Sequence, residues 1–347
     1  MKPRNGVLAS RRSALSAMTL SAMAAALLAL PSSGLSADLP GEGKTVRPGY
    51  TGLLEERFQT EVVIIGLERL GYEVEEMKLM DVPALHVATG QGDLDFIAAH
   101  WDPLQTAFYT QAGGPDTVTK VGTLVEGCMQ GYLIDKRTAD EYHITNIDQL
   151  RDPEIAKLFD SDGDGKADLA GCPPGWGCER VVEHHMDAYD LRKTVTHRQG
   201  QFGAMAADTV TRFKAGERVL YYTYTPLWLS QVLIPGKDVE WLEVPRTDLP
   251  EEQQDLDLNT KLPDGRNIGY PVNVMRVMAN NEFLAENPAA RAWFELVTVP
   301  VEDVNAENLK AHEGEDSFED VRRHAQEWVD AHEEQVSAWL AEAAKAQ

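Results

Sequence analysis

The chain has 347 residues, of which 56 are acidic and 32 are basic, and its formal net charge at pH 7 is −24. A surface this negative repels phosphate backbones and anionic lipids, which argues against nucleic acid or a membrane surface as the partner. The acidity suits a salty habitat, and an ordinary acidic exported protein fits it equally well.

The first 37 residues have the pattern of a secretory signal peptide. An apolar run over 14–30 follows a basic start, small residues come next, and no acidic residue occurs before Asp38. This order is typical of a cleaved signal rather than a membrane anchor. We therefore predict cleavage after Ala37 and export of the mature chain, whose net charge becomes −28 because four basic residues are lost. Arg11 and Arg12 match a twin-arginine leader only in part, so the Sec and twin-arginine export routes both stay open.

Hydrophobic periodicity predicts an alternation of helices and strands along the mature chain. Helices are expected over 51–70, 84–90, 148–159, 179–191, 202–214, 282–297, 302–311 and 317–344. Strands are expected over 72–74, 93–101, 131–134, 193–197, 219–223, 239–244 and 272–278. Such alternation is typical of α/β proteins with mostly parallel sheets flanked by helices.

The domain organisation follows from the length of the mature chain and from its lack of a linker. About 310 residues are enough for about two domains. No Pro/Gly/Ser-rich linker separates two halves, so we expect the chain to cross between two lobes more than once, near 135–137 and near 262–269. The predicted lobes are 38–135 together with 268–347, and 136–267. Such lobes form a hinge, and ligands bind in the crevice at the strand ends.

Sequence motifs for catalysis are missing from the mature chain. It contains no G-x-S-x-G, H-E-x-x-H, G-x-x-x-x-G-K-[ST] or G-x-G-x-x-G pattern. The common nucleophile, zinc-protease and phosphate-loop signals are therefore absent, and we expect a protein that is not an enzyme and needs no cofactor. A secreted hydrolase with an unrecognised carboxylate site stays open as an alternative.

A short acidic segment matches the first half of a calcium-binding loop. Its acidic residues are Asp160, Asp162, Asp164 and Asp168. Gly165 stands at the sharp turn of the motif, but Gly171 occupies the twelfth position, where a bidentate Glu should be. The segment predicts either a weak calcium loop or an Asx-rich surface turn, and the turn is favoured, so no metal is expected. A calcium-stabilised secreted protein is therefore a further alternative.

The three cysteines predict one disulfide and one free thiol. Cys172 and Cys178 flank the turn-forming segment Pro-Pro-Gly-Trp-Gly, and we expect them to pair, which leaves Cys128 free. Closing so small a loop removes only about 2 kcal/mol of unfolded-state entropy, so its main use would be local rigidity.

Aromatic residues at predicted strand ends and on this loop indicate a cation site. Trp101 and Tyr224 each close a strand just before a proline, and Trp176 stands inside the disulfide loop. Aromatic faces attract a quaternary ammonium, by about 2 kcal/mol for each desolvated contact. Gly177 and Cys178 precede a predicted helix, whose free N–H groups form an anion site. Together these features suit a small zwitterion with a trimethylammonium and a carboxylate.

Several segments carry a family resemblance from about Leu39 to the C-terminus. They are 131–136 (GYLIDK), 144–150 (ITNIDQL), 164–169 (DGKADL), 171–179 (GCPPGWGCE), 194–197 (TVTH) and 221–226 (YYTYTP). With them the chain closely resembles the periplasmic glycine betaine/proline betaine-binding proteins of osmoprotective ABC transporters, of the enterobacterial type. The resemblance implies a two-lobed, type II-like periplasmic binding protein. It also implies a monomer that delivers its ligand to the permease and ATPase subunits of a transporter.

The resemblance also implies roles for individual residues. In the family three tryptophans enclose the ammonium, and the matching positions here are Trp101, Trp176 and, as a departure, Tyr224. The amides of Gly177 and Cys178 match the pair that holds the ligand carboxylate, and the family disulfide matches Cys172 and Cys178. Gln105 stands where relatives have a carboxylate-binding histidine. These departures leave choline, carnitine and dimethylsulfoniopropionate open as ligands.

Overall fold

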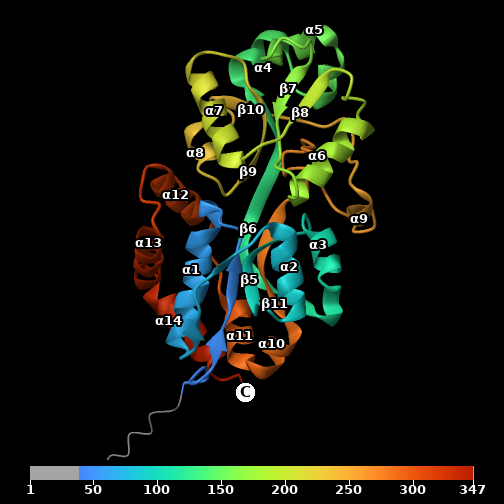
Figure 1. The fold of residues 1–347 in the computed structure, drawn as a ribbon. Helices are drawn as coiled ribbons and strands as arrows, with labels where there is room; N and C mark the ends of the chain where they lie inside the picture. The colour runs from blue at the N-terminus through green and yellow to red at the C-terminus, as the bar shows by residue number, and fades with distance from the viewer. Residues whose placement is uncertain (1–38, 347) are drawn as a thin grey trace, which may run out of the picture. The chain divides into compact units, whose positions relative to one another are not determined.

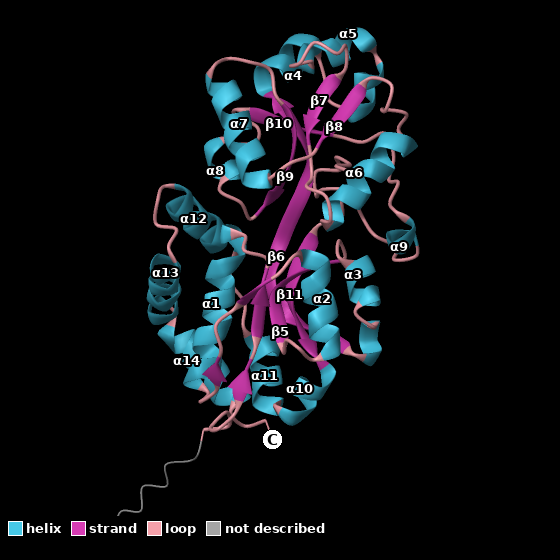
Figure 2. Cartoon of the chain, in the orientation of Figure 1, coloured by secondary structure: helices cyan, strands magenta, loops and turns pink. Residues whose placement is uncertain are grey.

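A β-sheet flanked by helices organises residues 39–346, the part of the chain that the computed structural model describes (Figure 1, Figure 2). The predicted signal peptide over 1–37 lies outside the described residues. None of the helices described is long and apolar enough to cross a membrane.

The strands and helices follow one another in the alternation expected from the sequence. The strands are β1 (Thr45–Val46), β2 (Pro48–Tyr50), β3 (Glu73–Val74), β4 (Lys78–Leu79), β5 (Phe96–Asp102), β6 (Val118–Asp135), β7 (Ala167–Ala170), β8 (Val195–Arg198), β9 (Leu220–Thr225), β10 (Val239–Leu242) and β11 (Asn273–Asn280). The α-helices are α1 (Leu54–Arg69), α2 (Val82–Gln91), α3 (Thr106–Gln111), α4 (Lys136–Tyr142), α5 (Pro153–Ala156), α6 (Gly177–Ala188), α7 (Phe202–Lys214), α8 (Leu229–Val232), α9 (Glu251–Gln254), α10 (Asn281–Glu286), α11 (Pro288–Leu296), α12 (Val301–His312), α13 (Phe318–Ala331) and α14 (Glu333–Ala343). Short 3-10 helices are η1 (Gly114–Asp116), η2 (Ile147–Arg151) and η3 (Lys157–Phe159).

The long strand β6 connects two groups of strands. The strand order is β4-β2-β5-β11-β6-β9-β7-β8, and β10 pairs with β6 beside this path. β6 pairs with β11 as far as Cys128 and with β9 from Met129 onward. Figure 1 shows β6 running from the group around β5 and β11 into the group around β7 to β10. The predicted strand over 131–134 is therefore only the last part of an 18-residue strand.

The α/β class agrees with the sequence prediction, and the strand pairing is mixed, with five parallel and four antiparallel pairs. Pairs β1–β3, β2–β4, β2–β5, β7–β8 and β7–β9 are parallel, whereas β6 runs antiparallel to β9, β10 and β11. β5 and β11 are also antiparallel. The reason is the path of the chain, because β6 runs from one group of strands into the other and β11 returns alongside it.

Three predicted helices are divided by local chemistry. The stretch over 148–159 breaks at Pro153, and the side chain of Asp152 accepts a hydrogen bond from the Glu154 amide to cap α5. Pro288 separates α10 from α11, because proline clashes with a continuing helix and lacks an N–H group. The predicted helix over 317–344 breaks at His332 into α13 and α14.

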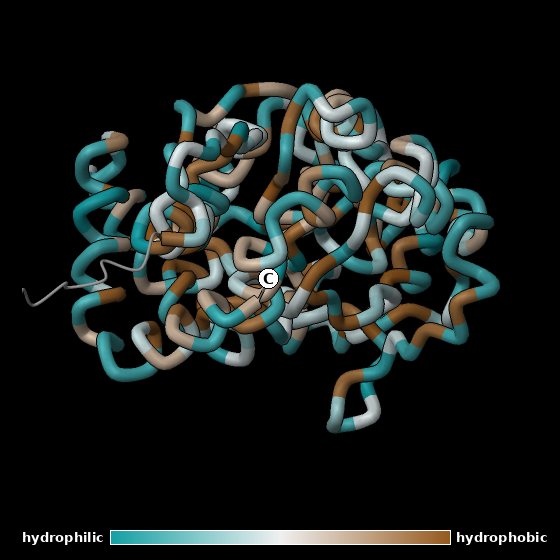
Figure 3. The backbone as a smooth tube through the Cα atoms, turned by 90° about the horizontal axis from the view of Figure 1, so that it is seen from below, coloured by the Kyte–Doolittle hydropathy of each residue, from teal (hydrophilic) through white to brown (hydrophobic). Residues whose placement is uncertain are grey.

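Apolar side chains bury both faces of the sheet. A small cluster that includes Leu85, Ile97 and Met278 packs between α2 and the strands, and a much larger cluster contains residues of α1, α6 and α11. In Figure 3 the tube alternates between hydrophilic and hydrophobic colours along the outer helices. α13 is such a helix, since Val321, Ala325 and Val329 are buried on one side of it.

Candidate functional site

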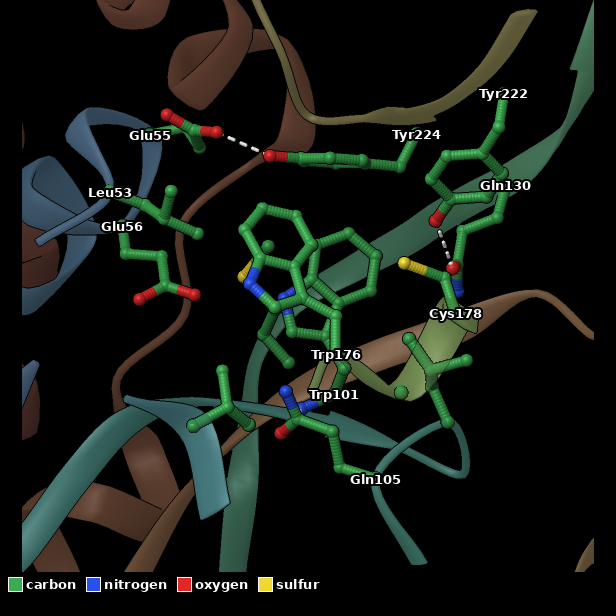
Figure 4. Close-up of a pocket in the computed structure, with 14 residues that line it drawn as sticks. Leu53, Glu55, Glu56, Trp101, Gln105, Gln130, Trp176, Cys178, Tyr222 and Tyr224 are labelled. Carbon is green, nitrogen blue, oxygen red and sulfur yellow. Dashed lines mark hydrogen bonds between the residues drawn. The ribbon is translucent and has the colours of Figure 1, made fainter. Parts of the chain in front are cut away.

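One cavity is lined by every residue for which the sequence predicted a role in ligand binding (Figure 4). These residues are Trp101, Gln105, Trp176, Gly177, Cys178 and Tyr224. The ends of β5 and β9 and the start of α6 supply them, and the first turn of α1 closes another side of the cavity. Segments far apart in sequence therefore meet at one place.

The three predicted aromatic residues lie ring to ring in this cavity. The centroids of Trp101 and Tyr224 are 5.5 Å apart with the planes at 85°, and those of Trp176 and Tyr224 are 6.3 Å apart at 61°. Edge-to-face packing of this kind leaves ring faces available to a cation. Phe202, at the start of α7, packs behind Trp176 and Tyr224 at 5.5 and 5.2 Å. Sequence reasoning missed Phe202, since it reads as the first apolar residue of an amphipathic helix.

The disulfide loop places Trp176 at the start of α6. Cys172 and Cys178 are joined, as predicted, with their Cα atoms 5.8 Å apart. Trp176 is the N-cap residue of α6, and the Gly175 amide donates to the Glu179 side chain at 2.6 Å. The loop is therefore held both covalently and by a hydrogen bond within the first helical turn.

The start of α6 presents main-chain donors to the cavity. Gly177 and Cys178 are its first two residues, and among the described residues neither amide donates a hydrogen bond. Free N–H groups and the positive end of the helix dipole favour an anion here. A side chain at 177 would crowd Leu104, because a Cβ atom there would lie 3.0 Å from the Leu104 carbonyl oxygen.

A hydrogen bond from a nearby backbone amide orients the Gln105 side chain. Its side-chain oxygen accepts a hydrogen bond from the Trp101 amide at 2.9 Å, and the residue is buried. Since that bond occupies the oxygen, the NH₂ group faces the cavity (Figure 4). Gln105 can therefore donate to a ligand, but it carries no charge.

Gln130 is a second amide in the cavity that sequence reasoning missed. It is fully buried in the middle of β6, and its oxygen accepts a 2.6 Å hydrogen bond from the Tyr222 hydroxyl. Its nitrogen has no acceptor among the described residues. A buried N–H group without an acceptor costs free energy. This group lines a cavity in which a ligand could supply the missing acceptor.

Two carboxylates in the first turn of α1, Glu55 and Glu56, also line the cavity. The Tyr224 hydroxyl donates to Glu55, and the Thr51 hydroxyl donates to Glu56 at 2.5 Å. Burial raises the pKa of Glu55, and it raises the pKa of Glu56 to about 8. A signal for Glu55 was present in the sequence, since it stands seven residues before Val62 on the apolar face of the predicted helix.

The predicted calcium loop brings three of its four carboxylates together. Oxygen atoms of Asp160, Asp162 and Asp168 all lie within 4.8 Å of one another, and Asp164 is outside this group. The Arg198 guanidinium contacts Asp162 at 2.5 Å and Asp168 at 2.9 Å. The Arg198 guanidinium thus occupies the position of a cation at the cluster. This arrangement agrees with the Asx-rich turn rather than with a calcium loop.

Comparison with known proteins gives the chain a family context. Residues 44–331 match the family described as the substrate binding domain of ABC-type glycine betaine transport systems. The chain is 48% identical over 317 residues to the glycine betaine-binding periplasmic protein OusX of Dickeya dadantii. This match covers 91% of this chain and 95% of that protein. It is 49% identical over 315 residues to the glycine betaine/proline betaine-binding periplasmic protein of Salmonella typhimurium, with the same coverage.

A solved structure supports the same fold. The lactococcal OpuAC protein, in a closed conformation complexed with glycine betaine, superposes with a TM-score of 0.65 at 17% identity. The match covers 86% of this chain and 99% of that one. The two-lobed binding-protein fold predicted from the sequence is confirmed by this similarity.

Proposed function

Because the chain belongs to the family of substrate-binding domains of ABC-type glycine betaine transport systems, we propose that it captures glycine betaine or proline betaine for uptake. The family consists of binding proteins, so the chain is a binding protein and not an enzyme.

The observation that carries the proposal is the group of aromatic rings in one cavity. Trp101, Trp176 and Tyr224 come from β5, from the disulfide loop and from β9, and their centroids lie within 6.3 Å of at least one other ring of the three. The quadrupoles of such rings attract a trimethylammonium without requiring a hydrogen bond, which a quaternary ammonium cannot donate.

A site for the ligand's carboxylate is supported by a set of neutral hydrogen-bond donors. The Gly177 and Cys178 amides stand at the start of α6, and Gln105 and Gln130 add side-chain NH₂ groups. We assign the ligand carboxylate to these donors. With the aromatic contacts and after the ordering cost, we expect a dissociation constant on the order of 1 µM.

The lobes are assigned by the same reasoning. We propose that 38–135 with 268–347 form one lobe and 136–267 the other, which is supported by the change of β6 partners from β11 to β9. This change lies at Cys128 to Met129, a few residues before the crossing expected at 135.

Export and partners complete the proposal. The named relatives are periplasmic, and the proposed signal peptide over 1–37 would place this chain in the periplasm as well. There the mature protein acts as a monomer and passes its ligand to the permease and ATPase subunits of an ABC transporter.

Another quaternary ammonium or sulfonium ligand is the second candidate. Tyr224 and Gln105 replace the tryptophan and histidine implied by the family resemblance, and no Lys, Arg or His occurs among the described residues that line the cavity. A cation without a carboxylate, such as choline, would meet no positively charged side chain there. Carnitine and dimethylsulfoniopropionate belong in the same comparison.

Calorimetric titration tests these candidates directly. We expect glycine betaine or proline betaine to bind with a stoichiometry of one per chain at moderate salt. Absence of heat and of a fluorescence change up to millimolar betaine would overturn the proposal. Parallel titrations with choline, carnitine, dimethylsulfoniopropionate and calcium, with assays for ester and glycoside hydrolysis, separate the alternatives.

A further inference from the structure

Glu55 and Glu56 place two acidic groups in a cavity that we assign to a cationic ligand. Glu56 is 5% exposed and Glu55 is partly buried. Figure 4 shows the Glu55 carboxyl directed at the Tyr224 hydroxyl and the Glu56 side chain on the same side of the cavity. Gln130, whose buried nitrogen has no acceptor among the described residues, lines the same cavity. A donor and two acids at one cavity point to a ligand with separated charges.

The hydrogen bonds to the pair are few and come from neutral donors. Glu55 accepts a hydrogen bond from the Tyr224 hydroxyl, and Glu56 accepts one from the Thr51 hydroxyl. Two adjacent carboxylates in a desolvated site resist ionising together unless a cation approaches. Burial raises the pKa values of both groups, which agrees with this expectation.

The nearest basic side chains are bonded to other residues, and the Arg57 charge partly offsets the rise that burial causes in the pKa of Glu55. Arg57, the next residue of α1, lies over the Phe318 ring at 4.2 Å and donates to the Asp316 carbonyl. Arg322 of α13 is bonded to Glu61 and Glu68.

The remaining neighbours of the pair are neutral or bonded to other groups. Asp303 of α12 accepts from the Trp328 indole at 2.9 Å. His86 of α2 lines a smaller neighbouring cavity with Glu56, and burial lowers its pKa to about 4, so it is neutral above that pH. Tyr222 and Tyr224 of β9 have pKa values well above 10 and stay neutral as well.

We propose that Glu55 and Glu56 together form the counter-charge of the ligand's quaternary ammonium, and that the pair loses a proton to solvent when the cation enters the cavity. This inference rests on the proposed function and deepens it. The proton leaves one carboxyl oxygen for bulk water, and no other bond forms or breaks. Since the Glu55 charge adds to burial in raising the pKa of Glu56, the ionisation of the two groups is linked.

The sign of the pH dependence follows from this exchange. A cation beside the pair favours the ionised form, so ligand binding lowers the pKa of the pair. Between the lowered and the original pKa, protons are released and affinity rises with pH, by at most about tenfold per pH unit for one proton. Above about 8, where Glu56 is ionised without ligand, the rise should end. A protonating histidine would give the opposite sign.

Calorimetry in paired buffers measures the proton directly. Glycine betaine is titrated at pH 7 into the mature protein in phosphate and in Tris, whose ionisation enthalpies differ widely. We expect the observed heats to differ by the release of up to about one proton per ligand. Titrations between pH 5.5 and 9 should show the dissociation constant falling up to about pH 8 and then becoming constant.

Isosteric variants assign the effect to the pair. Glu55→Gln, Glu56→Gln and the double variant remove ionisable groups while keeping side-chain size, and the double variant should release no proton. At pH 8 each single variant should bind glycine betaine about tenfold more weakly, and at pH 5.5 the differences should nearly vanish. Glu61→Gln is the matched control, since Glu61 lies on the same helix, also has a raised pKa and pairs with Arg322 outside the cavity. Thermal melting verifies that every variant is folded.

The possible failures are distinct. If glycine betaine binds the native protein with equal heats in both buffers, or if the double variant releases as many protons as the native chain, the counter-charge assignment is wrong while the proposed function stands. If neither native protein nor any variant binds a betaine at any pH, the proposed function itself fails.

Discussion

Tyr224 contributes a ring face and a hydroxyl, and these two parts can be separated by substitution. We expect Tyr224→Trp to be tolerated, because an indole gives an equal or better face to a cation. Tyr224→Phe keeps the face and loses the hydrogen bond to Glu55, which should weaken betaine binding several-fold. Tyr224→Ala removes the face and should cost about 2 kcal/mol or more. Calorimetric titration of the three variants measures each part, and native-like affinity of Tyr224→Ala would remove Tyr224 from the site.

Gln105 offers a neutral donor where a histidine would offer a titratable one. In Gln105→His, protonation below about pH 6.5 should add a charge-assisted bond to the ligand carboxylate. The affinity of the variant divided by that of the native protein should therefore increase as the pH falls from 8 to 5. A ratio that is constant across this range would place position 105 away from the carboxylate.

Sequence reasoning reached some residues of the cavity and missed others for one physical reason. Trp101, Trp176 and Tyr224 stand at strand ends or on a braced loop, where their positions alone are informative. Glu55 contacts Tyr224 across 169 residues of sequence, and Gln130 faces the cavity from the interior of a strand. Contacts of that kind depend on which elements become neighbours, and hydrophobic periodicity does not contain that information.

The disulfide loop is an element whose contribution to binding should exceed its contribution to stability. It joins residues separated by six positions, so it removes only about 2 kcal/mol of unfolded-state entropy, yet it positions Trp176 and the first amides of α6. Reduction should weaken betaine binding strongly and lower the melting temperature little. Calorimetry and thermal melting with and without reductant check this, and a large melting shift at unchanged affinity would be the contrary result.

The free thiol provides a control for that experiment. Cys128 is fully buried in β6, and burial raises its pKa to about 12. In the oxidised, folded protein a thiol reagent should therefore react slowly, and denaturation should expose one thiol per chain.

Betaine binding should also be sensitive to a single methyl group added at the start of α6. In Gly177→Ala the new Cβ would lie 2.9 Å from a side-chain carbon of Leu104 and 3.0 Å from its carbonyl oxygen, so the helix start must shift. We expect betaine affinity to fall by about tenfold or more, because the amide donors move with the helix. Gly203→Ala in α7 is the control, since its nearest neighbour, the Gln201 side chain, is 3.9 Å away. Equal affinities for the two variants would argue against an anion site at α6.

At the scale of elements, periodicity located most helices and strands but not their breaks or their directions. Helices α1, α6, α7 and α12 lie close to the predicted ranges. Pro153 and Pro288 divide predicted helices, and proline could have been weighted more heavily in both places. The antiparallel course of β6 and β11 could not be predicted, since a strand pattern looks the same in either direction.

At the scale of the whole molecule, side chains from both proposed lobes meet around the cavity and beside it. The Leu227 amide donates to Asn305 of α12 at 3.0 Å, and the Trp228 ring stacks on His312 at 3.7 Å. These contacts join 136–267 to the C-terminal helices, and they would have to separate for a ligand to enter between the lobes.

Ligand binding should therefore reduce the size of the protein in solution. Small-angle scattering of the mature chain should give a smaller radius of gyration with saturating glycine betaine than without it, because a ligand at the proposed site would contact both proposed lobes and favour a closed arrangement. Identical scattering curves would indicate a rigid site that is formed before binding.

The continuous strand β6 also affects how tightly two weak half-sites can hold one small molecule. Trp101, Gln105 and the Glu55–Glu56 pair stand on one side of its change of partner, and Trp176, Gly177 and Tyr224 stand on the other. Because an unbroken strand joins them, the second half-site meets a ligand held by the first at a high effective concentration. Stiffening or loosening β6 would change affinity for every ligand by a common factor, and substitutions in either half-site would change the preference among ligands.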